Sequence, residues 1–546
     1  MNKTLCHRLI WIPGLLGVWI IPFLSGYSQE IALEETIMAT LSEEYLMPNE
    51  KLWVQIMATH EGKPTPSKVA YMELLNRDYV PVVQELTALK SGQACGYLTI
   101  PDNLPSDYYL LRIYTRNSPY YSPENGVFHQ LVGIVNPLIP PVSGAKPVDD
   151  TFLSTASNAI SDNSLQLFEH TLDDEKISLQ LLGQPSDVLT TSISYQGEFP
   201  PIPVVREERL YDAQPEPKNY IYEIFGHIIH GKSLERVIDT AETFFLSAHG
   251  LESKFIIGTA RPTGDVFFET GDFSHFNYVI AQSDADKEQL NFVVESPFWQ
   301  QKPTDEFTIP YLSFSDSSLS FLQERMVASQ AASYFQSWSP DPIPSNPRLF
   351  LPDRSYLLDD YNRFDDMATV IREYVPEVLV RREDRRTVFR SVNKPANQVF
   401  KTNPLILIDG LPILDNDAFS KFNPVGIKQM EILNREFYLN HKLFEGAITL
   451  TSFDNDFGKY DLPKNALFLA YKGIQYPLTP IEFAPVDQHL SSLGSLLLWK
   501  TVTLKGGNEN ITIPKPVLKG AYKVTVTKWG ETCNDSVQKE KIIQIY

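Results

Sequence analysis

The sequence contains one close pair of histidines, His227 and His230, and imidazole groups are common zinc ligands. The surrounding residues Tyr222–Ile229 alternate like a strand. Side chains three positions apart on a strand point to opposite faces, so both rings could reach one ion only across a bulge. We therefore expect two partly buried strand histidines, and we predict no metal-binding residue here.

Two short acidic runs offer oxygen ligands of the kind that calcium prefers. They are Asp454-Asn455-Asp456 and Asp415-Asn416-Asp417. The run at Asp454 lacks the third acidic position and the downstream glutamate of the known calcium loop. Aspartates in such positions ordinarily cap turns through their own backbone. We expect turn caps, and we predict no cofactor.

Two further clusters admit a binding interpretation beside a structural one. Arg381, Arg382, Arg385 and Arg386 surround Glu383 and Asp384, which is typical either of a site for an acidic partner or of a solvated turn whose charges neutralise one another. A group of tyrosines could stack on sugars or anchor a partner protein, or could fill a core: Tyr108, Tyr109, Tyr114, Tyr120 and Tyr121. We favour the structural interpretation for both clusters.

Catalytic signatures are missing from the sequence. It contains no G-x-S-x-G elbow, no H-E-x-x-H, no Walker loop and no G-x-G-x-x-G. We predict that the protein is not an enzyme and has no catalytic residue, although scattered acids could still converge as in glycoside hydrolysis. Cys95 and Cys533 are far apart in the sequence. We expect two separate small core residues, and leave open whether they pair.

Composition indicates an exported β-rich protein. The 546 residues suffice for about three to five domains, and 40 prolines favour short strands joined by stiff turns. The formal net charge of -20 repels phosphate backbones, which argues against nucleic acid as a partner. Residues 1–28 combine Lys3 and Arg8 with an apolar run and small residues at Gly26 and Ser28, the pattern of a secretory signal.

The residues after this signal alternate as strands separated by turn formers, which is typical of an antiparallel sandwich. The run from Tyr45 to Glu50, the strand from Ser67 to Asn76 and the run Ile100 to Arg112 resemble, in order, motifs of macroglobulin-like (MG2-type) domains. The resemblance implies a seven-stranded spacer sandwich over residues 29–136. Macroglobulins that trap proteases covalently carry a Cys-Gly-Glu-Gln thioester. Here Tyr97 and Leu98 follow Cys95-Gly96, which excludes that chemistry.

Proline-rich joints divide the middle of the chain. We predict a second small β domain over 147–198, an Ig-like or regulatory-like β domain over 217–299, and a helical and irregular connector over 300–364. Helical spacing of apolar residues predicts one helix around Leu322, behind a cap at Asp316. It predicts a second around Ile371, behind a cap at Asp365 and stopped by Pro376.

Residues 365–456 resemble the plug domain of TonB-dependent receptors. The resemblance rests on four segments in order: Pro404–Ile413 with the turn Asp409-Gly410, then Asn423-Pro424, the strand Gln429–Leu433 and the strand Gly446–Thr451. A receptor of that family continues into a barrel of about 22 strands. Too few residues follow Thr451 for such a barrel, so the resemblance implies a plug-like domain alone. Residues 457–546 return to β structure, like the closing module of Bacteroidota envelope proteins that join macroglobulin-like and plug-like domains.

The sequence thus predicts a mainly β protein. We expect tandem macroglobulin/Ig-like β-sandwiches, a small α+β plug-like domain and a C-terminal β-sandwich-like module. As a function we expect a non-catalytic binding or scaffold protein in the periplasm or at the outer membrane. It would dock an outer-membrane or periplasmic protein through the plug-like domain and associate with the membrane only through partners. The alternative is a surface glycan- or peptide-binding accessory of a nutrient transporter. The oligomeric state is left open.

Overall fold

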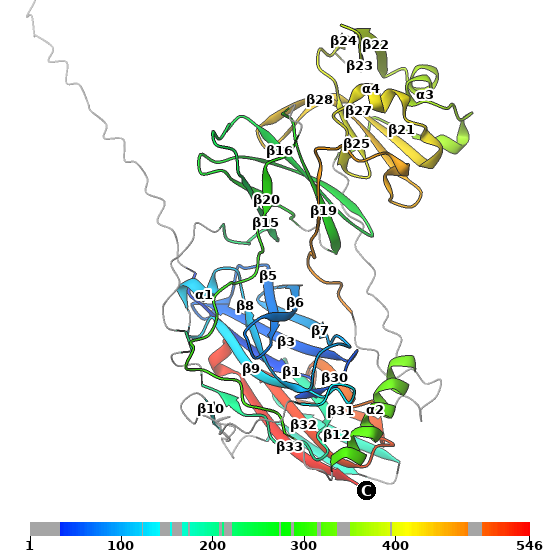
Figure 1. Ribbon diagram of the computed structural model, residues 1–546. Coiled ribbons are helices and arrows are strands. Elements are labelled where there is room, and N and C mark those ends of the chain that lie inside the picture. Colours follow the sequence, from blue (N-terminus) through cyan, green and yellow to red (C-terminus); the bar gives the residue numbers. More distant parts are fainter. Residues whose placement is uncertain are drawn as a thin grey trace, which may run out of the picture.

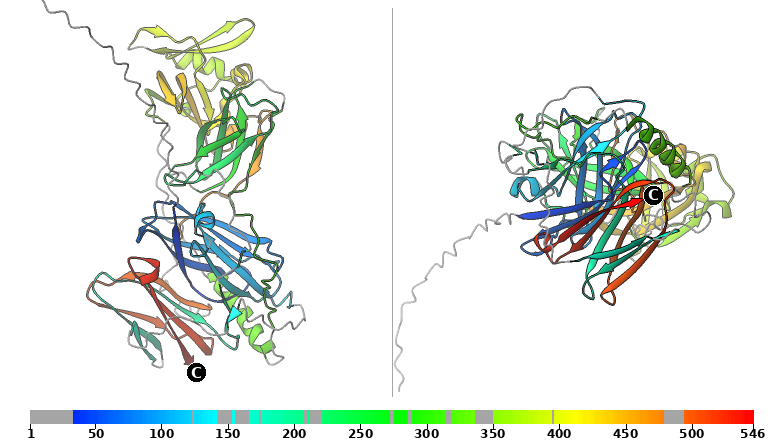
Figure 2. Two further views of the ribbon diagram at one scale, coloured as in Figure 1. Left: turned by 90° about the vertical axis from the view of Figure 1, so that its left-hand side faces the viewer. Right: turned by 90° about the horizontal axis from the view of Figure 1, so that it is seen from below.

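The computed structural model describes residues 33–122, 124–141, 153–154, 166–172, 175–206, 210–211, 221–271, 275–285, 289–313, 318–335, 350–393, 396–478 and 494–546. Strands dominate these residues, and four units follow one another along an extended body (Figure 1; Figure 2). The secretory signal expected over residues 1–28 lies outside the described residues. Among the described residues, no helix combines the length and apolar character that a bilayer crossing requires.

The first sandwich covers residues 33–136, where the sequence predicts a spacer sandwich. Its smaller sheet contains β1 (Glu35–Leu41), β3 (Lys51–His60), β4 (Lys63–Pro64) and β7 (Gln93–Thr99). Its larger sheet has the order β2 (Tyr45–Leu46), β9 (Val127–Ile134), β8 (Asp107–Tyr114), β5 (Val69–Leu75) and β6 (Pro81–Ala88). The short helix α1 (Ser118–Tyr121) connects β8 to β9.

The larger sheet is buried on both faces. Its inner face packs against the smaller sheet, while its outer face is covered by apolar residues between 199 and 211, by residues 307–312 and by Leu322 of helix α2 (Ser318–Phe335). This explains why β8 reads as a continuous apolar run rather than as an alternating one, since a strand covered on both sides has no polar face.

The second sandwich is assembled from two distant parts of the chain. One sheet has the order β11 (Phe168–Leu172), β12 (Lys176–Leu182) and β31 (Asn508–Pro514). The other has the order β30 (Leu496–Thr503), β13 (Val188–Tyr195), β32 (Gly520–Trp529) and β33 (Val537–Ile545). The sequence predicts residues 147–198 and 457–546 as separate units. The strand pairing instead joins them, because neither half supplies enough strands to cover its own apolar face.

The third sandwich is inserted between the two halves of the second. One sheet has the order β18 (Asp265–Glu269), β15 (Ile228–Ser233) and β20 (Phe292–Val294). The other has the order β17 (Ser253–Thr259), β16 (Thr243–Gly250), β19 (Phe276–Ser283) and β29 (Leu467–Ala470). The strand predicted at Tyr222–Ile229 begins only at Ile228. β29 comes from the segment that the sequence analysis assigns to the C-terminal module.

The α+β unit, residues 350–460, is inserted in turn between β20 and β29. Its sheet has the order β21 (Arg354–Leu357), β27 (Ile427–Leu439), β28 (Lys442–Ser452), β25 (Leu405–Ile408) and β26 (Leu411–Pro412). Helices α3 (Met367–Tyr374) and α4 (Asn416–Lys421) contribute to its core. A small sheet of β22 (Val378–Glu383), β23 (Arg386–Asn393) and β24 (Gln398–Val399) lies at the far end of the body (Figure 1). β21 pairs with β27, so this unit begins before the predicted boundary at 365.

A two-stranded ladder of β10 (Leu153–Ser154) and β14 (Val204–Val205) completes the strand pairing. After β29 the chain crosses back toward the first sandwich through residues 471–476, here called the return segment. Leu86 of β6 forms a parallel bridge with Ile474 of this segment. The units are therefore nested along the chain. The α+β unit is inserted in the third sandwich, and the third sandwich is inserted in the second.

Candidate functional site

The hairpin around Asp409 and Gly410 forms as the sequence predicts. Leu407 pairs with Pro412 and Ile408 with Leu411, while Asp409 and Gly410 both adopt positive φ, 46° and 77°. Such a pair of angles is that of a type I′ turn, which the Asp-Gly dipeptide favours. The short helical turn predicted at Asn423-Pro424 is present over Pro424–Gly426.

The Asp409 carboxylate is buried and connects the hairpin turn to residues 452 and 457 of the α+β unit. It accepts hydrogen bonds from the backbone N–H and hydroxyl of Ser452, at 2.8 and 2.6 Å, and from the N–H of Phe457 at 2.9 Å. Burial raises the pKa of Asp409, and these hydrogen bonds only partly offset it. Its role is structural.

The two histidines lie in different environments. His227 is buried, with Nδ1 2.8 Å from Glu223 Oε1 and Nε2 2.8 Å from the hydroxyl of Tyr471. His230 lies between Asp265 and Glu295, each 3.0 Å from a ring nitrogen. The described residues contain no group of three or more histidines, cysteines or acids that could hold a metal ion.

Glu223 is the centre of a buried network between the first and third sandwiches. Arg116 Nη1 lies 3.0 Å from its carboxylate, and the Tyr71 hydroxyl donates to it at 2.9 Å. Burial alone would raise the pKa of Glu223, but His227 and Arg116 outweigh it, so the pKa is lowered. A buried charge with this many partners fixes the geometry of the junction, since removing one partner leaves the others uncompensated.

The acidic turns act as caps. Asp415 is the N-cap of α4 and accepts from the N–H groups of Asp417 and Ala418. Asp456 accepts from the Gly458 N–H, and Asn455 bonds Ser253 Oγ and the carbonyl of Gly250.

The arginine cluster is exposed in the structure, whereas the tyrosine cluster is mostly buried. The arginines lie on the exposed hairpin of β22 and β23, whose turn is Asp384-Arg385. Tyr108, Tyr109, Tyr114 and Tyr120 are buried, and the half-buried Tyr121 stacks on Tyr222. Cys95 and Cys533 are both free thiols, the first exposed and the second buried.

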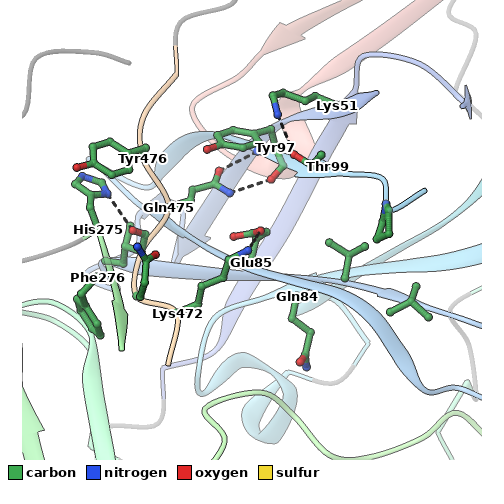
Figure 3. Close-up of a pocket in the computed structure, with 16 residues that line it drawn as sticks. Lys51, Gln84, Glu85, Tyr97, Thr99, His275, Phe276, Lys472, Gln475 and Tyr476 are labelled. Atoms are coloured by element: carbon green, nitrogen blue, oxygen red, sulfur yellow. Dashed lines mark hydrogen bonds and ion pairs between the residues drawn. The ribbon is translucent and has the colours of Figure 1, made fainter. Parts of the chain in front are cut away.

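A cleft that no sequence motif signals lies between the first sandwich and the return segment, with a volume of about 480 Å³ (Figure 3). Its walls come from β3, β6 and β7 of the first sandwich, from β19 of the third, and from residues 472–476. Lys472 pairs with Glu85, and the Tyr476 ring stacks on His275 with ring centres 4.2 Å apart. The residues that line the cleft come from five separate parts of the chain, so only the tertiary arrangement brings them together.

Comparison of the sequence with protein-family models and with curated proteins finds no match. Among solved structures, the native conformation of Escherichia coli alpha-2-macroglobulin aligns at 8% identity over 94% of this chain and 40% of that chain, with a TM-score of 0.24. Salmonella alpha-2-macroglobulin reacted with methylamine aligns at 8% identity over 94% of this chain and 40% of that chain, with a TM-score of 0.23. The chain thus spans about two fifths of the length of these bacterial alpha-2-macroglobulins. Likeness at this level supports no conclusion about activity or partners.

Proposed function

We propose that the protein is a non-catalytic binding and scaffold protein of the cell envelope, which docks an outer-membrane or periplasmic protein through its α+β unit. The observation that carries this proposal is the way the units are joined. Apolar cores and buried ion pairs continue across their boundaries, so the chain presents its far end on an extended, stiffened body (Figure 1).

The junction between the third sandwich and the α+β unit is the clearest case. Phe245, Phe255 and Ile257 of the third sandwich form one apolar cluster with residues of the α+β unit that include Leu407 and Phe444. The Asn440 side chain donates to the Ile257 carbonyl at 2.7 Å, and Gln282 donates to the Pro412 carbonyl at 3.1 Å. An apolar junction crossed by these two hydrogen bonds opposes hinge motion between the units, which suits a spacer.

One surface of the α+β unit has the composition of a docking surface. Val425 and Phe453 are 65% and 50% exposed, and the Phe453 N–H donates to the carbonyl of Gly426, next to Val425. The Arg363 guanidinium lies 5.7 Å from the centre of the Phe453 ring and is held by the carbonyls of Pro424 and Ile427. Aromatic and arginine side chains on a pre-ordered backbone are the usual anchors of protein interfaces.

The proposal is tested by affinity purification of the tagged protein from its native envelope in mild detergent, with mass spectrometry of the bound proteins. We expect a stoichiometric envelope protein with the parent chain. We expect its loss with the double variant Val425→Ser and Phe453→Ser. The control is Leu138→Ser, which removes an 84% exposed apolar side chain just after the end of the first sandwich. A parent chain that purifies without a partner, or a partner retained equally by both variants, contradicts the docking proposal.

The alternative function, a glycan- or peptide-binding accessory, has lost the feature that motivated it. The tyrosines that would form an aromatic platform are core residues, except for the half-buried Tyr121. Localisation in the envelope rests on the signal pattern of residues 1–28. A fusion of these residues to a reporter that is active only after export tests it directly.

A further inference from the structure

The cleft between the first sandwich and the return segment is bordered by the edges of two sheets. β6 is the last strand of the larger sheet of the first sandwich, and β7 pairs only with β3 among the described strands. An edge strand presents backbone N–H and C=O groups that another extended chain can pair with.

The return segment already uses both edges. The Gln475 N–H donates to the Leu86 carbonyl at 2.8 Å, which extends the larger sheet by one bridge. The Gln475 side chain accepts from the Tyr97 N–H and donates to the Tyr97 carbonyl, both at 2.9 Å (Figure 3). An extended chain segment therefore fits between these edges, held at β6 through its own backbone and at β7 through the Gln475 side chain.

The next pairing position on β6 is open. Because the N–H and C=O groups of alternate residues point to the same edge of a strand, those of Gln84 point the same way as those of Leu86. Gln84 lines the cleft, and no backbone partner meets it on that side within the described chain. A strand that enters the cleft beside Gln84 would continue the ladder that Leu86 begins.

A half-buried cation lies across the cleft from this edge. Lys51 Nζ donates to the Thr99 hydroxyl at 2.9 Å and lies 5.2 Å from the centre of the Tyr97 ring. No carboxylate forms an ion pair with it among the described residues, whereas the neighbouring Glu85 is paired with Lys472. Burial lowers the pKa of Lys51, although Glu85 partly opposes the shift, so a carboxylate placed directly beside Lys51 would gain more than at an exposed lysine. The Tyr476 hydroxyl, shielded from solvent at the same cleft, also has no hydrogen-bond partner in the described part of the chain.

We propose that this cleft binds an extended peptide segment of another protein that carries an acidic residue. Its backbone pairs with β6 at Gln84, and its carboxylate reaches Lys51. The alternation of N–H and C=O groups along an edge selects a peptide, because a saccharide offers hydroxyl groups without that alternation. The site is separate from the surface of Val425 and Phe453, so this inference stands or falls independently of the proposed docking through the α+β unit.

The test begins with random linear heptapeptides displayed on phage and selected on the immobilised full-length protein. Enriched peptides are then synthesised with a fluorophore, and their binding is measured by fluorescence anisotropy. We expect the enriched sequences to contain Asp or Glu, and Lys51→Gln to weaken binding by about tenfold, the cost of a charge-assisted hydrogen bond.

A matched pair of variants tests the backbone pairing. Gln84→Ala and Gln84→Pro both lose the side chain, which donates to Glu73 at 2.6 Å, but only proline removes the N–H that points into the cleft. We expect the proline variant to bind the peptide about tenfold more weakly than the alanine variant. Melting curves of both variants establish that they are folded, and Lys51→Gln remains a separate test if the proline variant is not.

Three outcomes overturn the proposal. The first is that no peptide is enriched above the level seen on a protein that carries both Lys51→Gln and Gln84→Ala. The second is that the peptide binds the parent and Lys51→Gln equally well. The third is that it binds folded Gln84→Ala and folded Gln84→Pro equally well.

Discussion

At the scale of single residues, buried carboxylates form hydrogen bonds and ion pairs that connect separate segments of the chain. Asp409 closes the hairpin turn, Glu223 joins two sandwiches, and Glu43 lies with Glu50 around Arg325 of α2. Each is an acid removed from water, which is tolerated only because hydrogen-bond donors or cations surround it. The sequence places Asp409 in a turn but does not show the burial of these acids, so the roles of Glu223 and Glu43 could not be assigned before the structure.

At Gly410 the positive φ of the backbone limits which residues can replace glycine. Its φ of +77° is strained for a β-branched side chain, whereas an added Cβ would make only ordinary contacts, from 3.4 Å, with the backbone of Lys254 and Phe255. We expect Gly410→Val to lower the free energy of unfolding of the α+β unit by about 1–3 kcal/mol. Thermal melting measures it, with Gly506→Val as the control because Gly506 has open space and no positive φ. Equal melting temperatures for Gly410→Val and its parent would count against this account of the hairpin.

Glu43 predicts a pH dependence of stability. Burial, and then the neighbouring Glu50, raise its pKa from 4.5 to about 8, although Arg325 opposes the shift. The folded state thus holds this proton more tightly than the unfolded state. Its stabilising contribution is fully present below about pH 4.5 and is lost as the pH rises through about 8.

Replacing Glu43 by glutamine should remove this contribution. We expect the difference in melting temperature, parent minus Glu43→Gln, to decrease as the pH is raised from 5 to 8. Calorimetry in matched buffers measures this difference. The exposed Glu198, replaced by glutamine, serves as the control. A parent-to-variant difference that stays constant over this pH range would show that the Glu43 carboxyl does not titrate there.

At the scale of elements, helix caps and strand patterns show how far local reasoning reaches. The helix around Ile371 is present as α3, and it ends at Tyr374 before Pro376 as predicted. Its N-cap is Asp366 rather than the predicted Asp365. Either aspartate could accept from the first turn, but the Met367 N–H bonds the Phe422 carbonyl, which sets where the helix begins. The cap predicted at Asp316 for α2 lies outside the described residues.

The cap gives a prediction at this scale. The Asp366 side chain accepts from the Thr369 N–H at 2.8 Å and from its hydroxyl at 2.9 Å. We expect Asp366→Ala to destabilise the α+β unit by about 1 kcal/mol, and Asp365→Ala to have little effect. Chemical denaturation of the two variants measures the difference. Equal destabilisation by both would mean that the two aspartates share the cap.

At the scale of the whole molecule, nested insertion makes the units depend on one another. β12 and β13 lie between residues 176 and 195, yet they pair with β30, β31 and β32 from the last part of the chain. The second sandwich therefore forms only when strands on either side of this long insertion meet. Long-range pairing of this kind is slow to form, because it closes very long loops.

A truncated chain tests this dependence. We expect a protein ending at residue 478 to be cut by chymotrypsin within residues 166–206, because β12 and β13 have lost their partner strands. Mass spectrometry locates the cleavage sites, and the full-length chain under the same conditions is the control. Protection of residues 166–206 in the truncated chain would instead show that they fold as an independent domain.

The sequence by itself determined the mainly β class, the strands of the first sandwich, the Asp409-Gly410 turn and the helix around Ile371. These follow from turn chemistry, apolar periodicity and capping, which act over a few neighbouring residues. Only the tertiary structure decided that two distant segments share one sandwich, that Tyr108 and its neighbours are core residues, and that Lys51, Gln84 and Gln475 meet at one cleft. Pairing across several hundred residues depends on which surfaces bury one another, and no local pattern carries that information.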